Sequence, residues 1–397
     1  MSMELLAPAG NFEKLRYAVW YGADAVYAAY RSFGLRAASE NFDEAGLEEA
    51  IRFCHQNGKK FYLAANIYPT DRDLLQMPAF FERLEQLRPD GLIIADLGVL
   101  KLARRYAPHL PVHISTQANV TNYEAAMVFY ELGASRIVLA RELTLSQIRA
   151  IRDRIPSRLE LECFAHGAMC ISYSGRCLIS AAMTGRSANQ GACAQPCRWR
   201  YALVEEKRPG EYYPVEEDAR GTYLMNSRDL CLLPYLKELQ EAGVCSLKIE
   251  GRMKSFYYVA RVTRAYRRAL AALDAGRPWD PALMEEVRAV SHRDYTAGFL
   301  FGQPGGEAQN LGSSGYLRQT DVVAVAAEEP GWVIQKNKFS AGERLWILAP
   351  EGVPEPVIIE GMQNEQGAPI ESAPHAGMRV RLPFSLPAHG ILFRDLQ

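Results

Sequence analysis

The feature that most constrains the fold is a repeat in which a short β-rich run is followed by a helical pattern. Strands and helices that alternate in this way form parallel βαβ units. The β-rich runs before residue 165 lie at Glu4–Ala7, Ala25–Ala28, Lys60–Ala65, Gly91–Ala95, Val112–Ser115, Arg136–Ala140 and Arg158–Phe164. The helical patterns between them include Phe12–Tyr21, Glu44–Gln56, Tyr123–Leu132 and Leu145–Ile155.

An eighth β-rich run, Cys245–Ile249, comes much later and precedes a helical pattern at Phe256–Leu273. Eight such units form a TIM-like (β/α)8 barrel. The competing fold is an open doubly wound sheet, but no GxGxxG motif follows the first strand, which disfavours its dinucleotide-binding form. The sequence therefore predicts an α/β barrel domain over residues 1–300, with an insertion at about 165–244 between strands seven and eight.

The pattern changes after about residue 300. Short alternating runs such as GWVIQKNKFSAGERLWILAP and GMRVRLPF, separated by Gly and Pro, replace the helical spacing. Such runs are typical of all-β domains. We expect a small C-terminal all-β barrel domain over residues 301–397.

The overall charge indicates no particular partner, because 45 basic and 46 acidic residues give a net charge of -1. The start, MSMELLAPAG, lacks the features of a signal peptide, and the most apolar stretch, Gly91–Ala103, is too short to span a bilayer. We expect a cytoplasmic protein without a membrane partner, for which a homo-oligomer is possible. In the cytoplasm the eight cysteines are better interpreted as thiols, metal ligands or core residues than as disulfides.

The cysteines fall into two groups. Cys54, Cys163 and Cys245 lie in apolar periodic runs and are expected to pack in the core. The other five cysteines lie among polar loop residues, and thiolates in such loops select zinc or iron–sulfur clusters. Their spacing, C-x6-C-x15-C-x3-C-x33-C, fits no short zinc-ribbon pattern. Four ligands complete either site, so one cysteine is spare. These five are Cys170, Cys177, Cys193, Cys197 and Cys231.

Polar residues stand at the ends of the predicted strands, where the active site of a TIM barrel forms. Lys248, Glu250 and Arg252 alternate by two and share one side of a strand, and inward charge is costly unless it is paired or used. We expect catalytic roles for His166, Glu162, Tyr173, Lys248 and Glu250. We expect substrate-binding roles for Asn66, His113, Gln117, Arg141 and Arg252. Asp96 is a further strand-end candidate, and Tyr27 is expected to pack in the core.

Several longer motifs are distinctive. They are HGAMCISYSGRCLIS, GRSANQGACAQPCR, NSRDLC and LKIEGRMKSFYYVARVTRAYRRAL, together with ELLAPAGNFEKLRYAVWYGADAVYAA and HISTQANVTN. With these motifs the chain resembles, over nearly its whole length, the collagenase-like peptidase family of unknown catalytic type. It is most similar to the tRNA hydroxylation branch of that family.

The resemblance implies prephenate-dependent hydroxylation of the wobble uridine of tRNA to 5-hydroxyuridine, supported by a [4Fe-4S] cluster. Other members of the family act on ribosomal RNA or on ubiquinone precursors. The family's cluster cysteines best match Cys170, Cys177, Cys193 and Cys231, and Cys197 could replace Cys193. The family commonly has valine at position 163, which supports packing for Cys163. Arg side chains at the rim would suit a dicarboxylate such as prephenate.

Two other classes of function stay open. A peptidase is one of them, but the chain has neither an HExxH motif nor a GxSxG motif. Cys170 and His166 could form a nucleophile–base pair, but a cluster would compete with that pair for the Cys170 sulfur. A non-catalytic RNA-binding protein with structural zinc or a cluster is the other class. The basic residues available for RNA phosphates are Arg261, Arg264 and Arg268 on one helix face, Arg186, Arg198 and Arg200 in the insertion, and Lys336, Lys338 and Arg344 in the C-terminal domain.

Overall fold

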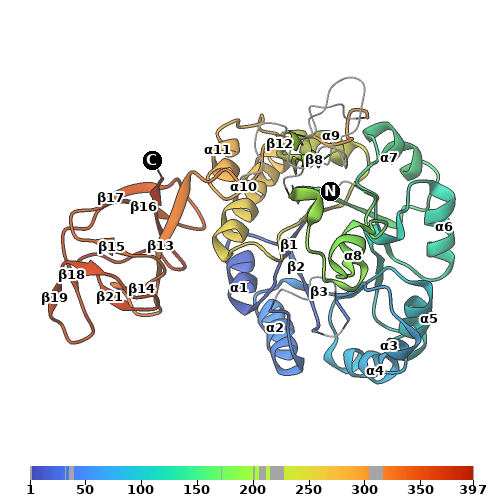
Figure 1. The fold of residues 1–397 in the computed structure, drawn as a ribbon, viewed down its shortest axis with the longest axis horizontal. Coiled ribbons are helices and arrows are strands. Elements are labelled where there is room, and N and C mark those ends of the chain that lie inside the picture. The colour runs from blue at the N-terminus through green and yellow to red at the C-terminus, as the bar shows by residue number, and fades with distance from the viewer. Residues whose placement is uncertain are drawn as a thin grey trace.

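The computed structural model describes residues 2–31, 33–34, 40–170, 172–199, 202–204, 212–214, 228–303 and 316–396. Eight parallel strands form a closed barrel, because the last of them pairs with both β7 and β1 (Figure 1). The strands are β1 (Glu4–Pro8), β2 (Ala25–Ala29), β3 (Lys60–Ala65), β4 (Gly91–Ile94), β5 (Val112–Ile114), β6 (Arg136–Val138), β7 (Glu160–Ala168) and β11 (Ser246–Ile249). The predicted TIM-like barrel is confirmed.

Helices surround this barrel. They are α1 (Phe12–Trp20), α2 (Glu44–Gln56), α3 (Asp71–Leu74), α4 (Met77–Leu87), α5 (Leu97–Tyr106), α6 (Tyr123–Glu131), α7 (Leu145–Arg152), α9 (Leu236–Glu241), α10 (Phe256–Asp274) and α11 (Leu283–Arg288). At the N-termini of α1, α2, α5, α6, α7 and α10, a side chain accepts a hydrogen bond from a backbone N–H group that the first turn leaves unpaired. Asp96 caps α5 in this way by accepting from the N–H of Val99, so this strand-end candidate is a helix cap. Among the described helices, none is both long and apolar enough to cross a membrane.

The insertion begins inside an extended β7. This strand runs four residues past the predicted end because β10 (Asp229–Cys231) pairs antiparallel with residues 166–168. A register shift between β7 and β11 places Lys248 opposite Phe164 but Ile249 opposite His166, so Ala165 is skipped. Such a bulge interrupts the alternation of side chains along the strand. The remaining described elements are α8 (Ile179–Thr184), β8 (Ala202–Val204), β9 (Tyr212–Pro214) and, beside β10, β12 (Tyr295–Thr296).

Beyond this barrel lies an antiparallel half-barrel that confirms the predicted all-β domain. Its main sheet has the order β17-β16-β22-β13-β14-β21-β18-β19, and β15 and β20 form a separate pair. The strands are β13 (Thr320–Ala326), β14 (Trp332–Gln335), β15 (Phe339–Ser340), β16 (Arg344–Leu348), β17 (Glu355–Ile358), β18 (Met362–Gln363), β19 (Pro369–Ile370), β20 (Ser372–Ala373), β21 (Arg379–Arg381) and β22 (Ile391–Asp395).

The C-terminal domain packs against α1 and α10. The Trp20 ring stacks on His389 with 3.6 Å between centroids, and the Tyr21 hydroxyl donates to the carbonyls of Leu348 and His389, each at 3.1 Å. Val325 and Ile391 of the β domain are part of the same apolar cluster as the barrel core. The two domains therefore share a buried apolar interface.

The predicted basic stripe on α10 serves this interface. Arg264 is 1% exposed, forms an ion pair with Glu286 and donates to the Pro350 carbonyl of the C-terminal domain. Arg261 is also buried, with its guanidinium 4.3 Å from the centroid of the Phe393 ring. The interpretation as a phosphate-binding surface is wrong for Arg261 and Arg264, because domain packing removes their side chains from solvent. Arg268, the third residue of the stripe, is 36% exposed and forms an ion pair with Glu286.

Candidate active site at the mouth of the barrel

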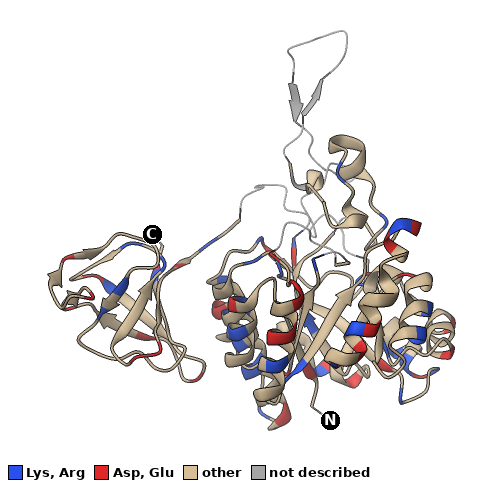
Figure 2. Ribbon diagram, turned by 90° about the horizontal axis from the view of Figure 1, so that it is seen from below, with Lys and Arg blue, Asp and Glu red and all other residues tan. Residues whose placement is uncertain are grey.

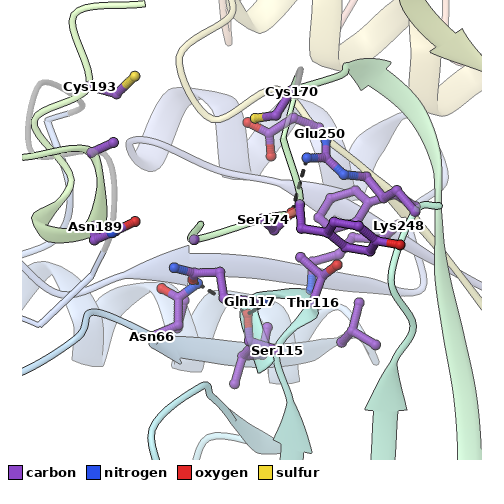
Figure 3. Close-up of a pocket in the computed structure, with 18 of the residues that line it drawn as sticks. Asn66, Ser115, Thr116, Gln117, Cys170, Ser174, Asn189, Cys193, Lys248 and Glu250 are labelled. Atoms are coloured by element: carbon purple, nitrogen blue, oxygen red, sulfur yellow. Dashed lines mark hydrogen bonds between the residues drawn. The ribbon is translucent and has the colours of Figure 1, made fainter. Parts of the chain in front are cut away.

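A cavity of about 160 Å³ lies at the C-terminal ends of the barrel strands, beneath the insertion (Figure 3). Active sites of this fold form at this end. The strand-end residues of its lining include Tyr27, Asn66, Ser115, Thr116, Gln117, Arg141, Phe164, Lys248, Glu250 and Arg252. The insertion adds Cys170, Tyr173, Ser174, Cys177, Asn189, Cys193 and Cys197. The structure thus brings together most of the residues that the sequence indicates.

One side of the cavity presents amides. Asn66 Nδ2 donates to Gln117 Oε1 at 2.7 Å, and the Tyr68 hydroxyl donates to the Gln117 carbonyl at 2.8 Å. Ser115 Oγ accepts from the Gln117 N–H at 3.4 Å. Figure 3 shows the two amide groups side by side, toward Asn189. The hydrogen bonds hold Gln117 in one orientation at the cavity wall.

The opposite side is cationic. Lys248 Nζ lies 4.5 Å from the centroid of the Tyr27 ring, and the Tyr27 hydroxyl donates to Glu250 Oε2 at 3.2 Å. Arg141 donates to the Ala168 carbonyl and to Ser174 Oγ, each at 3.0 Å. Burial lowers the pKa of the Lys248 ammonium from its ordinary value. Tyr27 is buried as predicted, and it also lines the cavity, where its ring could contact a base, the alternative role for this residue.

Two of the predicted site residues lie one layer below the cavity. Glu162 is completely buried and accepts from Lys248 at 2.9 Å and from Arg136 at 3.0 Å. Burial would raise the pKa of Glu162, but Lys248 and Arg136 outweigh it and hold this pKa below its ordinary value. His113 packs edge-on against Tyr62, and burial, followed by Arg136 and Lys248, holds its pKa well below the ordinary value. Neither residue is part of the cavity lining.

His166 lies on the outer side of the barrel wall. The bulge at Ala165 interrupts the alternation that would have turned it inward, and its ring packs among tyrosines instead. Its Nδ1 is 3.4 Å from the Tyr266 hydroxyl and its Nε2 is 3.4 Å from the Tyr295 hydroxyl. Burial lowers the pKa of His166 to about 3. The structure therefore does not bring His166 to the cavity, nor does it form the pair with Cys170 that a peptidase would need.

The cysteines divide nearly as expected. Cys170, Cys177 and Cys193 line the cavity, whereas Cys231 is 4% exposed in β10 and burial raises the pKa of its thiol to about 11. Cys197, the spare residue of the sequence prediction, also lines the cavity. Four thiols around one cavity match iron–sulfur or zinc sites in donor number and softness. Within the described ranges, no three His, Cys, Asp or Glu side chains converge closely enough to hold a metal ion.

The remaining cysteines pack in the protein. Cys54 and Cys163 are buried in the core cluster, as predicted, and Cys245 Sγ donates to the Leu161 carbonyl at 3.3 Å. The cavity residues that the sequence did not indicate include Thr116, Phe164, Ser174 and Asn189. Phe164 alternates with Glu162 along β7, and this spacing could have indicated an inward side chain. Ser174 and Asn189 are on the irregular loops of the insertion, where no periodicity indicates direction.

Comparison with known proteins agrees with the motifs. A sequence model of peptidase family U32 matches residues 10–310, and a model of the U32 C-terminal domain matches residues 318–394. The chain belongs to peptidase family U32. Among U32-like relatives, tRNA hydroxylation protein P of Escherichia coli is 38% identical over 424 residues, which cover 96% of this chain and 93% of the relative.

Two further relatives carry names that refer to RNA. tRNA hydroxylation protein P1 of Bacillus subtilis is 36% identical over 385 residues, with 94% of this chain and 89% of the relative covered. The 23S rRNA 5-hydroxycytidine C2501 synthase of Escherichia coli is 38% identical over 271 residues, which cover 68% of this chain and 40% of that protein. The resemblance inferred from the motifs is confirmed.

Proposed function

We propose that this U32 chain is an RNA-modifying hydroxylase that converts the wobble uridine of tRNA to 5-hydroxyuridine, with prephenate as the hydroxyl donor. The observation that carries the proposal is the cavity at the barrel mouth, which has a cationic side and an amide side. Relatives that match this chain over almost its whole length are named for tRNA hydroxylation, and another is named for hydroxylation of a ribosomal cytidine.

The cationic side suits the donor. Prephenate carries two carboxylates, and the cavity lining has three cations, Lys248, Arg141 and Arg252, and one carboxylate, Glu250, while Glu162 below it pairs with Lys248. Arginine binds carboxylates through two parallel hydrogen bonds, and charges attract more strongly where water is excluded. Arg252 lines this cavity, as its spacing from Lys248 and Glu250 predicted, and would be a further contact for a carboxylate. These cations would orient the donor without themselves entering the chemistry.

The amide side suits a uracil ring. Uracil offers an N3–H donor between two carbonyl acceptors, and a carboxamide offers one donor and one acceptor side by side. Gln117, which is held by Asn66 and Tyr68, would form such a pair with the base edge. The rings of Tyr27 and Phe164 line the same cavity and would pack against the uracil.

We assign the [4Fe-4S] cluster to Cys170, Cys177, Cys193 and Cys231, with zinc as the alternative metal. Three of these four residues line the cavity, which supports the assignment, and Cys197 is the cavity-lining alternative for a ligand position. A cluster bound by these thiolates would supply electron transfer or Lewis acidity at the edge of the cavity. Arg141, whose guanidinium lies beside the Cys170 sulfur, would add a positive charge near it.

The test is a reaction with purified components. The chain, reconstituted with iron and sulfide without oxygen, should convert unmodified tRNA to tRNA containing 5-hydroxyuridine when prephenate is added, as measured by mass spectrometry of nucleosides. Because a charged hydrogen bond contributes about 1.5–3 kcal/mol, Lys248→Ala should raise the KM for prephenate on the order of 10- to 150-fold. Lys338→Ala, at an exposed position of the C-terminal domain, is the matched control. Failure to form 5-hydroxyuridine, or an unchanged KM in Lys248→Ala, would contradict the proposal.

A further inference from the structure

The part of the insertion before Glu205 is rich in positive charge. Between Cys163 and Val204 the sequence has four arginines and no Asp or Glu, although the whole chain has a net charge of -1. Arg176 and Arg186 are exposed, and within the described part of the chain neither forms an ion pair. Figure 2 shows this segment raised above the barrel end opposite the N-terminus, coloured tan and blue. A patch of this kind attracts a polyanion.

Aromatic and apolar side chains are exposed on the same segment. Tyr173 and Trp199 are each 46% exposed, and Leu178 and Met183 are 69% and 49% exposed. Aromatic rings among arginines are characteristic of surfaces that bind single-stranded nucleic acid, since unstacked bases pack on the rings while the arginines contact phosphates. The outer face of the insertion therefore combines both kinds of contact.

Part of the same segment also lines the cavity. Tyr173, Ser174 and Cys177 line the cavity, and the exposed Arg176 lies between them in sequence. Gly175 has a φ of +75°, and a Cβ there would meet the Tyr68 hydroxyl at 2.7 Å, so the turn is held against the barrel. A nucleotide bound on the outer face is one short loop away from the cavity.

From these observations we propose that an RNA loop docks on the outer face of the insertion, defined by Tyr173, Arg176, Arg186 and Trp199. The proposal rests on the proposed function, because it names the surface that delivers the uridine. A single-stranded loop fits better than a duplex, since an unpaired base enters the cavity without the cost of leaving a stacked helix.

The C-terminal domain is the alternative docking surface for RNA, but its net negative charge disfavours RNA binding. Residues 320–396 contain ten acidic and six basic side chains. Lys336 forms an ion pair with Glu13 at 2.7 Å, and Arg379 forms one with Glu329 at 2.8 Å. Arg344, another basic residue that the sequence indicates in this domain, has its guanidinium over the Trp346 ring. This domain offers a polyanion little net attraction.

The experiment measures binding of an unmodified tRNA transcript, and of an RNA duplex of similar length, as a function of salt. The double variant Arg176→Ala/Arg186→Ala removes two cations, so the slope of log Kd against log salt should fall by about 1.4 for contacts to a single strand. Trp199→Ala should weaken tRNA binding on the order of 5- to 150-fold and leave the slope unchanged, because it removes stacking only. Lys338→Ala/Arg381→Ala, at two exposed positions of the C-terminal domain, is the matched control and should change neither.

The outcomes separate the docking surface from the function. If the wild type hydroxylates tRNA but both insertion variants bind it with the wild-type affinity and slope, the docking surface is wrong and the function stands. A loss of affinity in the Lys338→Ala/Arg381→Ala control alone would indicate that tRNA docks on the C-terminal domain instead. Equal affinity for the duplex would refute the preference for a loop. If the wild type neither binds nor hydroxylates tRNA, both proposals fail.

Discussion

Replacing Glu162 by glutamine should destabilise the barrel by about 3–5 kcal/mol, the usual cost of removing one partner of a buried ion pair. The carboxylate is completely buried, 2.9 Å from Lys248 Nζ and 3.0 Å from Arg136. Arg136 would still form its ion pair with Glu4, at 2.6 Å. Most of the lost stability would therefore come from Lys248, because its ammonium would face an uncharged amide. The free energy of unfolding is measured by urea denaturation, followed by tryptophan fluorescence and circular dichroism.

Glu160→Gln is the matched control. It makes the same chemical change beside the same guanidinium, at 2.7 Å from Arg136, but its side chain is 47% exposed. An exposed ion pair contributes at most about 1 kcal/mol, because water solvates the charge that remains. The difference between the two variants therefore measures the effect of burial.

A double variant tests the cause. Lys248→Met removes the cation that Glu162→Gln leaves unpaired, so the double variant should lose less stability than the sum of the two single losses, with a coupling of about 0.5–3 kcal/mol. Additive losses, or equal effects of Glu162→Gln and Glu160→Gln, would refute the view that this layer is held by a buried ion pair.

Three further predictions concern other parts of the molecule. The free energy of unfolding should fall as the pH drops from about 6.5 toward 3, by up to about 1.4 kcal/mol per pH unit. The reason is that His166 becomes protonated in the unfolded chain, while burial holds its pKa in the folded protein at about 3. His166→Phe should flatten this dependence, as measured by urea titrations at several pH values. After anaerobic reconstitution, an iron assay should show that Cys231→Ser has lost iron and that Cys197→Ser has kept it. The reverse result would indicate that Cys197, on the loop that lines the cavity, is the fourth ligand instead of Cys231. Arg264→Ala should destabilise the protein by about 3–5 kcal/mol through the domain interface, yet leave the salt dependence of tRNA binding unchanged.

Much of the barrel could be predicted because its signals are local. The helix predicted at Glu44–Gln56 has those bounds in the structure, with Asp43 as its cap, and each predicted barrel strand overlaps an observed one. Lys248 reaches the cavity from β11, and Glu250 and Arg252 line it just beyond the end of this strand at Ile249. The spacing by two therefore indicated all three residues correctly.

The failures arise where a contact distant in sequence overrides the local pattern. His166 follows Glu162 and Phe164 in alternation, but β10 and β11 impose different registers on β7 and the bulge turns His166 outward. The helical spacing of Arg261 and Arg264 puts them on one face correctly, but nothing in that spacing shows that another domain covers the face.

The alternation of strands and helices, the family motifs and the two sets of cysteines could be recognised in the chain before folding, because each depends on residues that are neighbours in sequence. The three-dimensional fold was needed to show which of the polar residues share the cavity, which support it from below and which hold the domains together. Periodicity specifies the side of an element on which a residue lies. What that side meets depends on strand register and domain packing, which are set by contacts between residues far apart in the sequence.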